Sequence, residues 1–338
     1  MKAIINDRGQ VKVADEPLPQ VKSHYILVKT LYSAISPGTE LTSLSRMPEN
    51  SASLGYSAAG IAVAVGDGVE GIGVNQSVAC YGSPYVKHAE YLLVPKHLAV
   101  PVPEQVKLRE ASTAGLGAIA IHALRQAQLS FGETVVVVGL GILGQIMARI
   151  AGAACARVVA FDLLPERCEA IVGVDGIQVC RTMEELRETV AEATNGKGAD
   201  SVFHCAGGKQ KELLDESFDW LRDRGRIVIV GDMYMEFTRG KMFLKEAQVL
   251  ISRAAGPGRY DEAYERDGCD YPIGYVRWTE ERNLAEYIRL LAERRIDVSG
   301  LITNCVSVGE AWQVYEQYRH NPGSLLGAVI SYGSAGSS

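Results

Sequence analysis

The sequence predicts an α/β protein in which a β-rich domain accompanies a doubly wound parallel sheet. Short β-branched runs separated by Gly- and Pro-rich turns fill roughly the first 115 residues, as expected for antiparallel strands. From about residue 118, strand-like runs alternate with longer helical patterns, which is typical of a parallel sheet with crossover helices. Short mixed elements return near the C-terminus, so both chain ends are expected to belong to the β-rich domain.

These changes of pattern set the expected domain boundaries. We expect residues 1–117 and 297–338 to form the β-rich domain and residues 118–296 to form the parallel-sheet domain. Segment 253–282 is expected to be an insertion that follows the last strand of that sheet. The strands expected in the sheet are 135–139, 157–161, 200–205, 226–231 and 248–252, and a helix over 281–292 is expected to close it.

Composition narrows the class of protein. The chain has 338 residues, 47% of them hydrophobic, which is enough for two domains with substantial cores. Its net charge of −6 gives no reason to expect nucleic acid or an anionic membrane as a partner. Its seven cysteines are dispersed without a CxxC pair, and the N-terminus lacks the apolar run of a signal peptide. We therefore expect a cytoplasmic protein without a membrane span.

The first candidate site is a glycine turn after a buried strand. Four valines at 135–138 lead into Gly139, Gly141 and Gly144, and a helical pattern follows. Gly139 permits a tight turn, Gly141 lets the backbone approach a pyrophosphate, and Gly144 lets the helix pack closely against the strand. The free N–H groups at the start of that helix attract phosphate. This βαβ pattern predicts a dinucleotide-binding domain of the Rossmann type.

An acidic residue at the end of the second strand predicts which dinucleotide binds. The strand 157–161 ends on Asp162, whose carboxylate would accept hydrogen bonds from ribose hydroxyls and repel a 2′-phosphate. We therefore expect NAD rather than NADP. The residues assigned to the cofactor site are Gly139, Gly141, Ile142, Leu143, Gly144, Asp162, Arg167, Cys205, Ala206 and Gly231.

Several segments together resemble the medium-chain dehydrogenase/reductase superfamily over essentially the whole chain. They are the opening Met1-Lys-Ala, Gly55 with Gly60–Gly66, His88-Ala-Glu-Tyr91, Gly139–Gly144 and Gly225–Gly231. The resemblance implies that the β-rich domain is GroES-like and catalytic, that the parallel-sheet domain binds the cofactor, and that the protein is a homodimer.

The chain departs from the zinc-dependent members of that family. Those members hold a catalytic zinc with a Cys, with the His and Glu of a Gly-His-Glu sequence, and with a further Glu or Cys. Here Ser36 stands in place of the Cys, and Tyr56 and Ser57 stand in place of the His and Glu. Hydroxyls are poor zinc ligands, so we expect no zinc at this site.

One other metal site is conceivable from the sequence. Cys80 and His88 could bind a metal together with Glu40 or Glu90, although their spacing matches no tight zinc motif. The alternative is a buried Cys on a strand and a His that lines a pocket, which we favour.

Without zinc, a side chain must handle the proton. Tyr56 and His88 are the two candidates for proton transfer. Thr39 could relay a proton from a substrate hydroxyl, and Glu40 could orient a partner or act as the base if its pKa is raised. Structural alternatives stay open for two of them. Tyr56 could simply fill the space left by the metal, and Glu40 could cap the helix that follows it.

The segment 253–282 concentrates aromatic and basic residues. Tyr271, Tyr275, Arg277 and Trp278 are assigned to substrate binding, because such side chains stack on rings and hydrogen-bond to hydroxyls or carboxylates. The same composition suits a subunit interface. The segment is similar to those of zinc-less members that resemble sugar-pathway oxidoreductases, which favours a polyhydroxylated substrate. Other motifs resemble the bacteriochlorophyllide-type dehydrogenases, which act on a hydroxyethyl group of a large ring.

The function predicted from the sequence is an NAD-dependent, zinc-independent dehydrogenase. It would oxidise the secondary alcohol of a sugar, cyclitol or similar polar ring to a ketone by hydride transfer. Two alternatives stay open: a zinc-less reductase of quinone or enone C=C bonds, and a non-catalytic NAD-binding protein.

Overall fold

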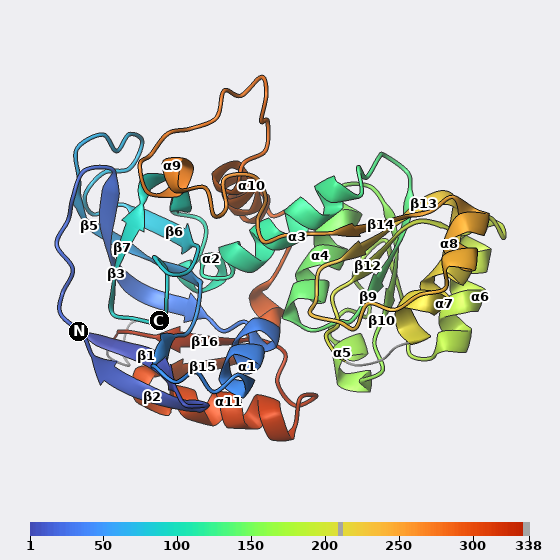
Figure 1. The fold of residues 1–338 in the computed structure, drawn as a ribbon, viewed down its shortest axis with the longest axis horizontal. Helices are drawn as coiled ribbons and strands as arrows, with labels where there is room; N and C mark the ends of the chain where they lie inside the picture. The colour runs from blue at the N-terminus through green and yellow to red at the C-terminus, as the bar shows by residue number, and fades with distance from the viewer. Residues whose placement is uncertain (209–211, 334–338) are drawn as a thin grey trace. The chain divides into compact units, whose positions relative to one another are not determined.

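The computed structural model describes residues 1–208 and 212–333, and the chain divides into two compact units. The β-rich unit comprises Met1–Ala118 and Ala254–Ser338, and the parallel-sheet unit comprises Ile119–Arg253. Both elements of the predicted fold class are present, as Figure 1 shows. Within the described residues, no helix combines the length and hydropathy that a membrane span needs.

The β-rich unit contains two sheets. The larger has seven strands in the order β15-β16-β3-β5-β6-β8, with β7 paired to β3, and the smaller has the order β2-β1-β4. The strands are β1 (Lys2–Asp7), β2 (Gln10–Asp15), β3 (Tyr25–Ala34), β4 (Ala52–Ser53), β5 (Ser57–Val65), β6 (Ser77–Tyr81), β7 (Tyr91–Pro95), β8 (Ala99–Pro101), β15 (Asn304–Ser307) and β16 (Ala328–Ser331). The helices are α1 (Pro37–Ser45), α2 (Leu108–Ala111), α9 (Glu262–Glu265), α10 (Glu280–Ala292) and α11 (Ala311–His320), with 3₁₀ turns η1 (Lys96–Leu98), η2 (Ser299–Leu301) and η3 (Val308–Glu310).

The parallel-sheet unit has the strand order of a dinucleotide-binding fold. Its six strands run β11-β10-β9-β12-β13-β14, and every neighbouring pair is parallel. In chain order this is 3-2-1-4-5-6, the Rossmann order. The strands are β9 (Thr134–Val138), β10 (Arg157–Phe161), β11 (Ile177–Cys180), β12 (Ala199–His204), β13 (Leu221–Ile229) and β14 (Gln248–Ile251). The helices are α4 (Ile142–Ala153), α5 (Pro165–Glu169), α6 (Met183–Thr194), α7 (Glu212–Trp220) and α8 (Arg239–Lys245), and α3 (Ala114–Gln126) crosses the boundary between the units.

Buried hydrophobic residues of the central strand pack against helices on both faces of this sheet. All five residues of β9 are buried, as expected for a strand that packs against helices on both sides. One face carries Val136 and Val138, which lie in a core cluster with Leu186 of α6 and Phe218 of α7. Figure 1 shows α4 on the other side of the sheet from α6 and α7. The first strand therefore ends at a turn that rigid packing holds in place.

The strands expected in the parallel sheet are all present, with ends displaced by a few residues. The structure also contains β1, β2 and β11, which the sequence did not predict. Strand β2 alternates exposed and half-buried residues and lies at the edge of the small sheet, so its sequence carries little hydrophobic signal.

The second predicted domain boundary differs from the structure. The first, after residue 117, agrees within one residue, but residues 254–296 belong to the β-rich unit and not to the parallel-sheet domain. Helix α10 packs on β8 and η1. Its Tyr287 donates or accepts a 2.8 Å hydrogen bond with the Thr113 hydroxyl, and its ring lies so close to Gly117 that a Cβ there would be 2.0 Å away. The helical pattern showed that α10 exists, but not which core receives its apolar face.

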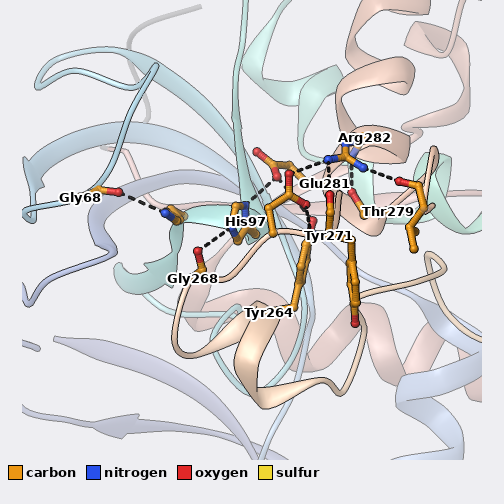
Figure 2. A network of polar contacts seen from close by, with 11 residues as sticks. Gly68, His97, Tyr264, Gly268, Tyr271, Thr279, Glu281 and Arg282 are labelled. Atoms are coloured by element: carbon orange, nitrogen blue, oxygen red, sulfur yellow. Dashed lines mark hydrogen bonds and ion pairs between the residues drawn. The ribbon is translucent and has the colours of Figure 1, made fainter. Parts of the chain in front are cut away.

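The inserted segment folds against the β-rich unit through a stack of rings. His97 of η1 stacks on Tyr264 with ring centroids 4.6 Å apart, and Tyr264 stacks on Tyr271 at 5.2 Å (Figure 2). The two nitrogens of His97 lie 2.7 Å from a carboxylate oxygen of Glu281 and 3.1 Å from the carbonyl oxygen of Gly268. The segment is therefore anchored at its middle and at the start of α10.

A buried pair of carboxyl groups lies in the same segment. Arg259 forms an ion pair with Glu265, and both side chains are buried. Glu280 is 1% exposed, and neither of its carboxylate oxygens has a hydrogen-bond partner in the described residues. Burial, together with the nearby charge of Glu265, raises the pKa of Glu280 to about 9. Glu280 is therefore a neutral acid in the folded protein at neutral pH.

This carboxyl group should make stability depend on pH. The folded protein keeps the Glu280 proton up to about pH 9, whereas the unfolded chain loses it near 4.5, so stability should fall between these values. Glu280→Gln should flatten this decline and stabilise the protein at pH 8–9 by about 1–3 kcal/mol. Denaturant unfolding at several pH values measures the effect, with the exposed Glu262→Gln as control. A decline as steep in Glu280→Gln as in the wild type would contradict the prediction.

Candidate functional site

The glycine turn has the geometry that a dinucleotide needs. Gly139 has φ +92°, a conformation that favours glycine. A Cβ on Gly144 would lie 1.8 Å from the Gly139 carbonyl oxygen, so only glycine lets α4 approach the turn. A Cβ on Gly141 would meet nothing within 4 Å. The turn thus requires glycine at position 139, and the close packing of α4 requires glycine at position 144. Gly141 faces open space at the start of α4.

The predicted ribose acceptor lies against this turn. Asp162 is 7% exposed, and its carboxylate accepts hydrogen bonds from the backbone N–H groups of Leu140 at 2.7 Å and Leu164 at 2.9 Å. Arg167 approaches the same carboxylate at 3.4 Å. The structure therefore brings Asp162 and Arg167 together with the glycine turn. These residues fit a dinucleotide, because a fixed acceptor lies beside N–H donors at a helix N-terminus.

The remaining cofactor candidates surround the same turn. Ile142 and Leu143 form the first positions of α4. Beyond the end of β12, the Ala206 N–H donates to the Val138 carbonyl, and a Cβ on Gly231 would lie 2.3 Å from the Ala206 carbonyl oxygen. These residues follow the carboxyl ends of neighbouring parallel strands, where ligands bind in such sheets.

Cys205 lies beside them as a packing residue. Its sulfur contacts the Met147 sulfur of α4 at 3.6 Å, and burial raises the pKa of the thiol to about 12. It is therefore a neutral thiol at physiological pH, without the ionised character of a reactive cysteine.

Three hydroxyls gather in the β-rich unit where α1 begins. The Tyr56 hydroxyl donates a 2.7 Å hydrogen bond to the Ser36 Oγ. Burial and the charge of Glu40 raise the pKa of Tyr56 well above its ordinary value, and hydrogen bonding to Ser36 and Thr39 opposes this only in part. Tyr56 is half-buried and Thr39 is exposed. We call Ser36, Thr39 and Tyr56 the hydroxyl cluster.

His88 and Glu40 lie beneath this cluster in the protein interior. His88 is 0% exposed, and its ring nitrogens lie 2.7 Å from the Ser33 Oγ and 3.0 Å from a Glu40 oxygen. Glu40 is 2% exposed. With both nitrogens occupied and no exposed surface, His88 does not reach a substrate hydroxyl. The geometry thus disfavours the expected role of His88 as the direct proton acceptor.

Two further members of this buried group, Tyr315 and Tyr332, could not be predicted from the sequence. Tyr315 of α11 donates a hydrogen bond to Glu40, and Tyr332 lies 2.9 Å from the Ser33 hydroxyl. These pairs are separated by 275 and 299 residues along the chain. Contacts at that separation leave no local pattern, so no motif could have indicated them.

The four predicted substrate residues do not form one cluster. The Tyr271 hydroxyl donates a hydrogen bond to the Asp261 carboxylate, and its ring packs in the ring stack. This hydrogen bond is the main cause that raises the pKa of Tyr271 to about 12. Tyr275 is 91% exposed. The Arg277 guanidinium lies 3.8 Å from the centre of the Trp278 ring, a cation–π contact. Tyr271 thus serves the packing of the segment, and only Arg277 and Trp278 are brought together.

Comparisons with known proteins agree with this architecture. The profile of the zinc-binding dehydrogenase family matches residues 126–266. The probable D-xylulose reductase A of Aspergillus terreus is 24% identical over 355 residues, which cover 93% of each chain. The probable quinone oxidoreductase of Schizosaccharomyces pombe is 28% identical over 232 residues, which cover 66% of this chain and 68% of that protein. The alcohol dehydrogenase TADH from Thermus sp. ATN1 superposes with a TM-score of 0.78 at 21% identity, covering 98% of this chain and 99% of the other.

These matches support the resemblance to the medium-chain dehydrogenase/reductase superfamily. The resemblance deduced from the sequence is thereby confirmed at the level of the superfamily. Medium-chain dehydrogenases and reductases include zinc-dependent and zinc-less members, so the side chains at the metal position must be tested individually.

Those side chains do not fit zinc. The Ser36 hydroxyl already accepts a hydrogen bond from the Tyr56 hydroxyl. The Ser57 hydroxyl donates a hydrogen bond to the Ser112 carbonyl at 2.6 Å and accepts one from the Gly115 N–H at 2.9 Å. In the parts of the chain that the structure describes, no three His, Cys, Asp or Glu side chains group in a way that could hold a metal. A medium-chain dehydrogenase with these residues offers hydroxyls where zinc would need thiolate and imidazole.

The alternative pair also lacks suitable donors. Cys80 is fully buried in a hydrophobic cluster, and burial raises the pKa of its thiol far above the ordinary value. One Glu90 oxygen accepts a 2.7 Å hydrogen bond from the Lys2 N–H. With the His88 nitrogens occupied as well, these residues are arranged for packing and hydrogen bonding.

The glycine turn allows a direct test of cofactor binding. Gly141→Ala should leave thermal stability nearly unchanged, because its Cβ meets open space, but should weaken NAD binding about tenfold or more by blocking the close approach of the pyrophosphate. Gly144→Ala should instead lower the melting temperature, because its Cβ would overlap the Gly139 carbonyl. Calorimetric titration and thermal unfolding measure both. Equal NAD affinity in the wild type and Gly141→Ala would show that the dinucleotide does not cross this turn.

Proposed function

We propose that the protein is an NAD-dependent oxidoreductase that interconverts a secondary alcohol and a ketone without zinc. The observation that carries the proposal is the hydroxyl cluster of Ser36, Thr39 and Tyr56, in which Ser36 and Tyr56 stand where the family resemblance implies two zinc ligands. The favoured substrate is a sugar, a cyclitol or a similar polar ring. The D-xylulose reductase relative, whose name gives it a sugar substrate, supports this choice.

The protonation state of Tyr56 indicates how the cluster acts. A nicotinamide, when bound, gives or takes a hydride at the substrate carbon. A phenol is protonated at neutral pH, and the raised pKa of Tyr56 keeps it so at higher pH, so its hydroxyl can donate a proton to the oxygen of a carbonyl substrate. Ser36 accepts the Tyr56 hydrogen bond and fixes the direction of the phenol. In this scheme Tyr56 acts as a proton donor in reduction, and alcohol oxidation becomes faster as pH rises.

Asp162 supports the choice of NAD. Its carboxylate is held in place by two backbone N–H groups and Arg167, so it cannot easily turn away from an incoming 2′-phosphate. The negative charge would repel that phosphate, and its oxygens would accept from a ribose hydroxyl.

Arg277 and Trp278 are proposed as the polar wall for a substrate ring. Their cation–π contact leaves a rigid, partly exposed surface that suits hydroxyl and carboxylate groups. Tyr271 is left out of this role because its hydroxyl and ring are engaged within the segment.

Replacing the proposed acid should remove catalysis selectively. Tyr56→Phe should lower kcat for ketone reduction by about 10²-fold, because a positioned proton donor contributes on this scale, while KM for the reduced cofactor stays the same. Tyr85→Phe is the control, since Tyr85 packs edge-on against Tyr25 and lies outside the hydroxyl cluster. Steady-state assays with a panel of ketoses and cyclic ketones measure the effect. Full activity in Tyr56→Phe would remove Tyr56 from the mechanism.

Cofactor preference provides a second test. The wild type should use NAD in preference to NADP, and Asp162→Ser should narrow this preference by about tenfold or more by removing the repelling charge. The ratio of kcat/KM for the two cofactors is the measurement. An enzyme that prefers NADP before any substitution would contradict the assignment.

The second candidate function is reduction of a conjugated C=C bond. The 28% identical quinone oxidoreductase relative favours it, and a protonated Tyr56 could serve as its acid as well. Turnover of quinones or enones, with no activity on ketoses or polyols, would favour this function over the first.

A further inference from the structure

A buried polar group underlies the hydroxyl cluster and joins distant parts of the β-rich unit. Its members are Ser33 on β3, Glu40 on α1, His88 in the loop between β6 and β7, Tyr315 on α11, and Tyr332 after β16. Ser33, His88 and Tyr315 are 0% exposed, and Glu40 is 2% exposed. Polar groups at such depth are costly unless all are hydrogen-bonded, and these are.

Glu40 is the acceptor at the centre of this group. Its Oε1 accepts the backbone N–H of Ser36 at 2.7 Å, and its Oε2 accepts from the Tyr315 hydroxyl and from His88 Nε2. Three donors converge on it, which is the environment of an ionised carboxylate. Since Ser36 is the N-cap of α1 and receives the Tyr56 hydrogen bond, Glu40 fixes the backbone that carries the hydroxyl cluster.

His88 acts on the other side of the cluster. Its ring lies against Gly55, where a Cβ would be 2.7 Å from three ring atoms, and Gly55 has φ +87°. Gly55 directly precedes Tyr56, so the ring supports the backbone from which the phenol projects. The His88 N–H and the Leu54 carbonyl also form a 2.8 Å backbone hydrogen bond.

Hydrogen-bond counting assigns the direction of the chain. His88 Nε2 faces an acceptor only, so it carries a proton and donates to Glu40. His88 Nδ1 can then accept from the Ser33 hydroxyl, which in turn accepts from Tyr332. In this arrangement every donor has an acceptor, the imidazole is neutral, and the single net charge belongs to Glu40.

We propose that Glu40 and His88 are positioning residues that hold the Ser36 and Tyr56 hydroxyls in place. The catalytic consequence of this inference rests on the proposed function. Its structural part, the positioning of the two hydroxyls, does not. The groups that act on Tyr56 are Glu40, the Ser36 and Thr39 hydroxyls of α1, and Tyr81 of β6, whose ring meets Tyr56 edge-on at 5.8 Å.

The positioning role is tested first by hydrogen exchange. Glu40→Gln keeps the shape of the side chain but loses its charge, so the Ser36 amide should exchange about tenfold faster. His88→Gln should have a similar effect, because it removes the imidazole whose N–H donates to Glu40 and whose ring lies beside Gly55. His97→Gln is a matched control, since His97 also pairs with a carboxylate in this unit but belongs to the ring stack. Unchanged Ser36 exchange in both Glu40→Gln and His88→Gln would overturn the positioning role.

Kinetics connect the inference to the proposed reaction. In Glu40→Gln, kcat for ketone reduction should fall about tenfold while KM for the reduced cofactor stays constant, because the cofactor residues belong to the other unit. A wild type that turns over no alcohol, ketone or enone would refute the proposed function, yet the exchange results would still decide the positioning role. Normal kcat in Glu40→Gln together with faster Ser36 exchange would overturn the link to catalysis.

Discussion

A carboxylate buried in the β-rich unit constrains the structure around it. Ionised Glu40 is stable away from water only if its oxygens are fully hydrogen-bonded, and the donors come from Ser36, His88 and Tyr315. These donors lie near the start of the chain, in the loop before β7, and on α11 close to the C-terminus. Providing hydrogen-bond donors to the Glu40 carboxylate therefore requires that early and late segments of the chain fold into the same unit. The two segments do belong to one unit.

The same constraint gives the hydroxyl cluster its chemistry. A zinc ion would bring positive charge to this position and lower the pKa of a bound alcohol. Here burial raises the pKa of Tyr56, and the negative charge of Glu40 beneath the cluster adds to that effect. A protonated phenol under these conditions favours donation of a proton over its removal from an alcohol.

Local patterns predicted much of this protein, and long-range contacts account for what they missed. The glycine turn and Asp162 could be predicted because their roles depend on neighbours within about thirty residues, in one βαβ unit. The helix α10 was expected correctly, but its assignment to the wrong domain followed from the lack of any local signal for the contacts of Tyr287 with Thr113 and Gly117. His88 was selected for its chemistry, whereas its burial depends on Ser33 and Glu40, about fifty residues away in the chain.

The central claim is that a medium-chain dehydrogenase fold works here with hydroxyls in place of zinc. Measuring the metal content of the purified protein by mass spectrometry, on the sample used for NAD-linked turnover of a polyol and ketose panel, tests it most directly. Turnover that persists in protein free of zinc, and that a chelator does not lower, is the expected result. Activity that rises in proportion to bound zinc, or is lost on chelation and restored by zinc, would contradict the claim.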